Sequence, residues 1–108
     1  MLEPAVFLWL VDLDDPALDA LAPCLSAQEQ ARAARYRGDA LQRGYRRARA
    51  ALRPILAHHT GQPPATLALA EGLLGKPVLD GLALHFNLSH SGALALVAVA
   101  SVPVGIDL

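Results

Sequence analysis

The chain has 108 residues, of which 54% are hydrophobic, and a formal net charge of −1. A chain of this length buries one hydrophobic core, so we expect a single lobe over residues 1–108. The near-neutral total gives no overall positive field, which argues against nucleic acid or an anionic membrane as a partner. The basic residues are nevertheless unevenly placed, because all eight arginines fall between Arg32 and Arg53.

Cysteine usage and the N-terminal sequence favour the cytoplasm. A lone cysteine, Cys24, cannot form an intramolecular disulfide and offers no metal-binding spacing. The N-terminus lacks the basic region of a signal peptide, and Asp12, Asp14 and Asp15 interrupt the apolar run that follows it. We therefore expect a cytoplasmic protein without a membrane span.

The first half of the chain predicts one strand and two helices. Aromatic and β-branched residues from Ala5 to Leu13 predict a buried strand that ends in an acidic turn. Ser26 and Glu29 have the spacing of a capping box, which predicts a helix that starts at Ser26. Gly38 ends this helix, and Asp39 is expected to act as the N-cap of a second, longer one.

The second helix should run toward His59 with its core and charged faces cleanly separated. Apolar residues recur at three- and four-residue steps and predict a core face made of Leu41, Tyr45, Ala48, Leu52 and Leu56. The rest of the surface is expected to carry the charge of Arg43, Arg46, Arg47, Arg49 and Arg53. Pro54 removes an amide donor inside this pattern, so we expect a kink or a restart there.

The second half predicts short strands separated by turns. A loop from Thr60 to Ala65 should precede a short strand at Leu67 to Ala70, and a turn-rich segment should follow. Three further strands are expected at residues 83–88, 93–100 and 102–108. Together these elements predict an α+β lobe in which a small antiparallel sheet packs on the long helix.

Three short stretches of this half place polar residues near strand ends: Gly75-Lys76-Pro77, Phe86-Asn87-Leu88-Ser89-His90-Ser91-Gly92 and Val104-Gly105-Ile106-Asp107-Leu108. Lys76 and His90 offer donors that are, or can be, positively charged, and Asn87 and Ser89 add neutral hydrogen bonds. Asp107 is a hard oxygen ligand of the kind that magnesium prefers. This set of groups suits a magnesium-bound diphosphate ester.

In these motifs, and in the arginine-rich helical region before them, the chain resembles 4′-phosphopantetheinyl transferases of the surfactin-synthetase-activating type. That family carries a GKP turn, an F-N-x-S-H-S-G segment and a [VI]-G-[VI]-D-[VIL] strand in the same order. The resemblance covers about Ser26 to Leu108 and corresponds to the amino-terminal half of a two-lobed fold. It implies a holo-[carrier-protein] synthase that moves 4′-phosphopantetheine from coenzyme A to a serine of an acyl or peptidyl carrier protein, with Mg2+ as cofactor.

The resemblance also implies roles for individual residues. The adenosine 3′-phosphate of coenzyme A would contact Arg32 and Arg43, and the nucleotide would lie against Gly75, Lys76 and Pro77. The coenzyme A cleft would be lined by Asn87, Leu88, Ser89 and His90. Asp107 matches the family's first magnesium ligand, and the catalytic residues on this chain would be His90 and Asp107.

The chain departs from the family pattern at Leu108, where family members continue with a second acidic ligand and a second lobe that carries a W-x-x-K-E-[SA] motif. The glutamate of that motif is implied to be a metal ligand and candidate base. We therefore expect this half alone to be inactive. The second lobe would come from the same polypeptide or from another chain.

Two other interpretations remain open from the residues. A non-catalytic binding module would keep affinity for coenzyme A or a carrier protein without transfer. A small helical interaction protein would use its arginine-rich face, and Lys76→Ala or His90→Ala would then leave nucleotide affinity unchanged. The carrier could belong to fatty-acid, polyketide or nonribosomal peptide synthesis.

Overall fold

The computed structural model of the chain describes residues 5–71, 77–79 and 84–101. Within these residues it has five strands: β1 (Val6–Asp12), β2 (Leu69–Glu71), β3 (Pro77–Leu79), β4 (His85–Ser91) and β5 (Leu94–Ala100). The α-helices are α1 (Ala27–Ala34) and α2 (Asp39–Thr60), and two 3-10 helices are η1 (Pro16–Cys24) and η2 (Pro64–Thr66). The strand expected at residues 102–108 lies outside the described residues.

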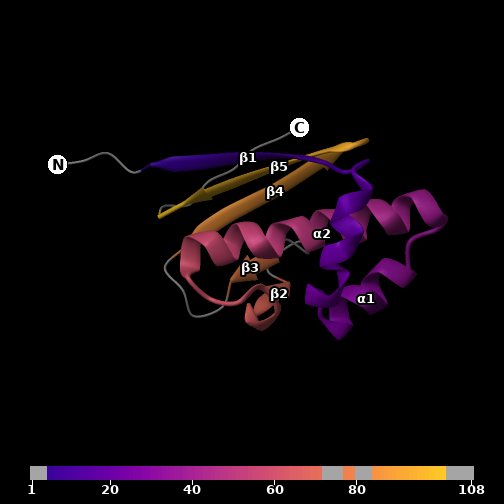
Figure 1. Cartoon of the computed structure of the whole chain (residues 1–108), viewed down its shortest axis with the longest axis horizontal. Helices are drawn as coiled ribbons and strands as arrows, with labels where there is room; N and C mark the ends of the chain where they lie inside the picture. Colours follow the sequence, from indigo (N-terminus) through magenta and orange to yellow (C-terminus); the bar gives the residue numbers. More distant parts are fainter. Residues whose placement is uncertain (1–4, 72–76, 80–83, 102–108) are drawn as a thin grey trace.

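The strands form two antiparallel sheets, a three-stranded one in the order β1-β5-β4 and a two-stranded one of β2 and β3. A tight turn joins β4 to β5, and Gly92 occupies it with a φ of 57° that favours glycine. The three-stranded sheet lies along one side of α2, and α1 lies on the other side (Figure 1). The expected α+β arrangement, with a small antiparallel sheet packed on a long helix, is confirmed.

The main core lies between α2 and one face of this sheet. Leu52 and Leu56 of α2 are fully buried against Val97 and Val99 of β5, because alternate residues of a strand point to the same face. Fully burying one such side chain contributes about 1.5–3 kcal/mol. The central strand β5 therefore anchors the sheet to the helix.

The expectation that the first strand is buried is wrong for one of its two faces. Trp9 and Val11 pack against the core, and Phe7 on their face is 52% exposed at the start of the strand. On the other face Val6, Leu8 and Leu10 are 50%, 63% and 68% exposed. The cause is geometric, since only one face of the sheet is covered by α2. The other face presents an apolar row to the surroundings.

The capping box at the start of α1 is confirmed. The Glu29 amide donates to the Ser26 hydroxyl oxygen at 3.1 Å, and the Ser26 amide donates to Glu29 Oε1 at 2.9 Å. Each bond satisfies an amide that has no partner within the helix. Glu29 is therefore fixed at the first turn of α1 with its carboxylate toward α2.

The N-cap of the long helix α2 lies one residue earlier in the chain than expected. Gly38 is its N-cap, with a φ of 88° and no side-chain capping bond, and Asp39 is the first helical residue. The acidic side chain still lies in the first turn, where the helix dipole favours it. The helix continues through Pro54 without a restart and ends at Thr60, one residue beyond the expected end.

The expected clean separation of core and charge on α2 is also wrong. Arg47, Arg49 and Arg53 are only 8%, 7% and 2% exposed, whereas Leu41 is 59% exposed. The buried arginines find carboxylates and carbonyl groups on neighbouring elements, as buried charges must. Those contacts define the candidate site.

Candidate functional site

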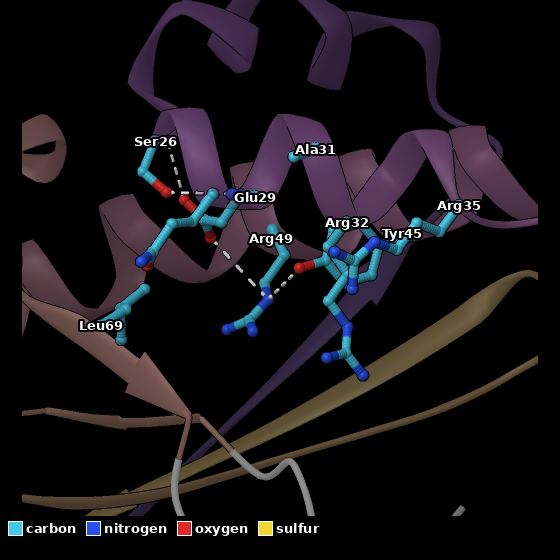
Figure 2. Close-up of a pocket in the computed structure, with 9 residues that line it drawn as sticks. Ser26, Glu29, Ala31, Arg32, Arg35, Tyr45, Arg49 and Leu69 are labelled. Carbon is cyan, nitrogen blue, oxygen red and sulfur yellow. Dashed lines mark hydrogen bonds and ion pairs between the residues drawn. The ribbon is translucent and has the colours of Figure 1, made fainter.

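A pocket of about 420 Å³ opens between α1 and α2 (Figure 2). Its lining residues are Ser26, Gln28, Glu29, Ala31, Arg32, Arg35, Tyr45, Arg49 and Leu69. Three of them are arginines, so the pocket has a basic wall. Such a wall suits a phosphate or carboxylate group.

Glu29 and Arg53 form a buried ion pair beside this pocket. Arg53 Nη2 lies 2.6 Å from Glu29 Oε1, and Arg53 Nε donates to the same oxygen at 2.8 Å. Arg53 Nη1 also donates to the carbonyl oxygens of Pro64 and Leu67 at 2.9 and 3.2 Å. Arg53 therefore ties α1, α2 and the segment around η2 together, and its role is structural.

Arg49 lies one turn before Arg53 on α2 and is less completely paired. Its Nε donates to the Tyr45 hydroxyl at 3.3 Å and lies 3.8 Å from Glu29 Oε2, and its guanidinium carbon lies 5.5 Å from the Tyr45 ring centroid. Figure 2 shows the Arg49 side chain reaching between Glu29 and the Tyr45 hydroxyl. Among the described residues, Arg49 Nη1 and Glu29 Oε2 are buried without a hydrogen-bond partner.

Only one of the two arginines expected to meet a phosphate lines this pocket. Arg32 lines the pocket from the last turn of α1. Arg43 is exposed and does not line it. The pKa of Asp19 in η1 is lowered mainly by the hydrogen bond from Arg47, and to a smaller degree by the positive charges of Arg47 and Arg43. The structure therefore does not bring Arg32 and Arg43 together in this pocket.

The residues expected to line a coenzyme A cleft lie along β4. Leu88 packs against the core, whereas Asn87 and Ser89 point to the opposite face of the sheet because neighbouring strand residues alternate. His90 is exposed near the end of β4, where it pairs with Ala95 of β5. None of these four residues lines the α1–α2 pocket.

The remaining expected site residues are only partly within the described chain. Pro77 is the first residue of β3 and pairs with Glu71 of β2. Gly75, Lys76 and Asp107 lie outside the described residues. Residues 5–71, 77–79 and 84–101 bring together no group of three His, Cys, Asp or Glu side chains that could hold a metal ion.

Three further pocket residues, Arg35, Tyr45 and Arg49, were missing from the expected site. The four-residue spacing of Tyr45, Arg49 and Arg53 along one helix face is a signal that the sequence contains. That spacing identifies a shared face but not its neighbour. The pairing with Glu29 appears only when α1 folds against α2.

A scan against protein-family models gives no match. Two enzymes of known name are nevertheless similar to the chain. It is 41% identical over 115 aligned residues to the 4′-phosphopantetheinyl transferase HetI of Nostoc sp., an alignment that covers the whole chain but 48% of that protein. It is also 40% identical over 58 residues to a 4′-phosphopantetheinyl transferase of Bacillus subtilis, covering 53% of the chain and 26% of that protein.

The chain belongs to the 4′-phosphopantetheinyl transferase family. It spans about half the length of the Nostoc relative. Its α+β lobe, with an antiparallel sheet on a long helix, agrees with one lobe of that family's fold. In the part of the chain that the structure describes, no helix combines the length and apolar character needed to cross a membrane.

Proposed function

We propose that residues 1–108 form the amino-terminal lobe of a 4′-phosphopantetheinyl transferase and supply the coenzyme A-binding half of its site. The observation that carries the proposal is the basic pocket between α1 and α2, which contains Arg32. A phosphate monoester is the part of coenzyme A that such a pocket suits, because guanidinium groups bind phosphate oxygens through charged hydrogen bonds. The pocket would therefore hold the adenosine 3′-phosphate.

Arg32 and Arg35 are placed one turn apart at the end of α1, so both can reach one bound group. Arg43 would contact coenzyme A only at a second point, because it does not line the pocket. The 3′-phosphate contact is thus proposed for Arg32 with Arg35. The contribution of Arg43 is proposed to be electrostatic.

The rest of coenzyme A would lie along the motifs in which the chain resembles the family. Asn87 and Ser89 share one face of β4, where their side chains can donate to an oxygen-rich ligand. Gly75, Lys76 and Pro77 are proposed to lie against the nucleotide. Leu88 would contribute by packing β4 against the core, since its side chain lies on the helix side.

The serine oxygen of the carrier protein would bond to the β-phosphorus of coenzyme A as the bond from that phosphorus to the bridging oxygen of the diphosphate breaks. The serine proton would pass to the glutamate expected on the second lobe, and adenosine 3′,5′-bisphosphate would leave. His90 is proposed to donate to the diphosphate, because its side chain is exposed and can carry a positive charge. Asp107 is proposed as a magnesium ligand, and bound Mg2+ neutralises charge on a diphosphate. We propose that the metal and coenzyme A are bound in the cytoplasm, as the sequence predicts.

A second lobe is proposed to complete the site. The Nostoc relative extends well beyond the aligned region, which leaves room for such a lobe in a longer protein. The apolar row of Val6, Leu8 and Leu10 supports this, because contiguous exposed apolar side chains are typical of a surface that another structural unit covers. The carrier protein would bind to the assembled pair.

Mass spectrometry of an apo carrier protein tests the proposal. The carrier is incubated with coenzyme A and Mg2+, together with either this chain or this chain extended by a second lobe. We expect phosphopantetheine to be added only with the second lobe present, and expect the chain alone to bind coenzyme A. Binding without transfer in both cases would instead indicate a non-catalytic module, and absence of both would exclude the proposed function.

A further inference from the structure

The Arg49 guanidinium is buried, but the described residues do not satisfy all of its hydrogen-bond donors. Its side chain is 9% exposed, and the hydrogen-bond acceptor of its Nε is the Tyr45 hydroxyl. Its Nη1 is buried and has no acceptor among the described residues. Buried donors are paired in nearly all folded proteins, so an unpaired one calls for a reason.

The cluster around Arg49 also carries an excess positive charge. Glu29 is the carboxylate between Arg49 and Arg53, and its Oε1 already accepts from Arg53 and from the Ser26 amide. Its Oε2 is 3.8 Å from Arg49 Nε, which is too long for a hydrogen bond. Guanidinium groups stay charged at any ordinary pH, so two buried positive charges face one negative charge. The pocket wall is therefore prepared for an anion.

We propose that Arg49 binds a phosphate monoester in the α1–α2 pocket, and that Glu29 and Tyr45 are positioning residues that hold its guanidinium there. The identity of that group as the 3′-phosphate of coenzyme A rests on the proposed function, whereas phosphate binding by Arg49 does not. An oxygen of the phosphate would accept from the unpaired guanidinium end and compensate the excess charge. Arg49 would thereby make the pocket select coenzyme A over 3′-dephospho-coenzyme A.

Calorimetric titration of the chain with coenzyme A and with 3′-dephospho-coenzyme A tests this selection. The unaltered chain is expected to prefer coenzyme A by roughly ten- to hundredfold, the effect of one or two charged hydrogen bonds. Arg49→Met keeps most of the side-chain length without its charge and should lower the preference about tenfold, and Arg32 and Arg35 would account for any preference that is left. Arg49→Lys should restore part of it, and Tyr45→Phe should reduce it less than Arg49→Met does. Arg46→Met is the matched control, because Arg46 lies on α2 outside the pocket lining and donates to Gln42.

A second measurement, the Tm of the chain in inorganic phosphate, separates this proposal from the proposed function. If phosphate raises the Tm of the unaltered chain but not that of Arg49→Met, phosphate binding by Arg49 is supported. If the unaltered chain then shows no preference for coenzyme A, the proposed function fails and the Arg49 proposal does not. Equal stabilisation of both chains by phosphate would overturn the Arg49 proposal. An equal loss of affinity for both coenzymes in Arg49→Met would also overturn it, since a purely structural role predicts that result. Circular dichroism monitors folding, and if Arg49→Met does not fold, Arg49→Lys and Tyr45→Phe carry the same comparison.

Discussion

Arg47 and Arg49 are two residues apart on α2, and they face opposite sides of the helix with different outcomes. On the η1 side, Arg47 Nε and Nη2 donate to the two carboxylate oxygens of Asp19 at 3.0 and 3.1 Å, and its Nη1 donates to the Leu13 carbonyl at 2.9 Å. On the α1 side, Arg49 has the Tyr45 hydroxyl as its acceptor and an unpaired Nη1. Both side chains are buried to a similar extent.

The difference separates an arginine that holds the fold together from one available to a ligand. Arg47 has an acceptor at each nitrogen, so an additional anion would have to displace a protein contact. Arg49 lines an open pocket with a nitrogen unpaired, so an anion adds an interaction without removing one. Degree of pairing, rather than burial or charge, is thus the feature that distinguishes the two faces of α2.

The largest expected effect comes from Glu29→Gln. This change leaves Arg49 and Arg53 without the carboxylate that they share, and removing one partner of a buried pair costs about 3–5 kcal/mol of unfolding free energy. Glutamine keeps an acceptor for the Ser26 amide, so the helix cap is retained. Urea denaturation measures the loss. A loss below about 1 kcal/mol would show that the burial of Arg49 and Arg53 does not depend on the Glu29 carboxylate. That result would contradict the contrast drawn with Arg47.

Comparing Arg47→Met with Arg49→Met tests the contrast directly. Arg47→Met should lower the free energy of unfolding, because the Leu13 carbonyl and Asp19 both lose their donor. Arg49→Met should leave the stability unchanged or raise it in the absence of ligand, because it removes an unpaired donor and an excess charge. Parallel urea denaturation in phosphate-free buffer measures both. The contrast fails if Arg49→Met is the more destabilising of the two.

A smaller effect is expected for Ser26→Ala, which separates the capping role of Glu29 from its ion pairs. The Glu29 amide would lose its acceptor, and loss of such a cap costs about 1 kcal/mol. Because the ion pair between Glu29 and Arg53 remains, the loss should be well below that of Glu29→Gln. Thermal unfolding of the two variants side by side gives the ranking. Equal losses would mean that capping alone explains the role of Glu29.

The sequence predicts the local features of this lobe well and the long-range ones poorly. The Ser26 and Glu29 capping box is four residues long, so its pattern is complete in the sequence and the structure confirms it. The pairing of Arg53 with Glu29 spans 24 residues and that of Arg47 with Asp19 spans 28, so neither can be read from helix periodicity. Arginines on a helix are ordinarily solvated, and only tertiary contacts show which are buried.

The same limit applies to the candidate site. Arg32 was expected at a phosphate and does line the basic pocket, because its place in the last turn of α1 follows from the predicted helix. Arg35 and Arg49 were missed because pocket membership depends on how α1 packs on α2. The exposed face of β1 was missed for a related reason, since an apolar run does not reveal how many of its faces are covered.

The smallest effect on stability is expected from His59 near the C-terminal end of α2. Unlike the arginines, which stay charged, this side chain can lose its charge. Trp9 Nε1 donates to His59 Nε2 at 3.1 Å, and the rings lie 5.8 Å apart. Burial, and to a lesser degree the charge of His58, lowers the pKa of His59 below its usual value. His59 is therefore held neutral in the folded state, with its proton on Nδ1 so that Nε2 can accept.

This arrangement predicts a pH dependence of stability that the permanently charged guanidinium groups do not have. Because the pKa of His59 is lower in the folded chain than the value of about 6.5 in an unfolded one, the unfolded state binds more protons below that pH. The stability from His59 should be fully present above about pH 7 and fall as the pH drops through about 6.5 toward the lower folded pKa. Urea denaturation at pH 7.5 and 5.5 measures this, and the fluorescence of Trp9, the single tryptophan, reports the ring contact. In His59→Gln the decrease should be smaller, and an unchanged decrease would place the titrating group elsewhere.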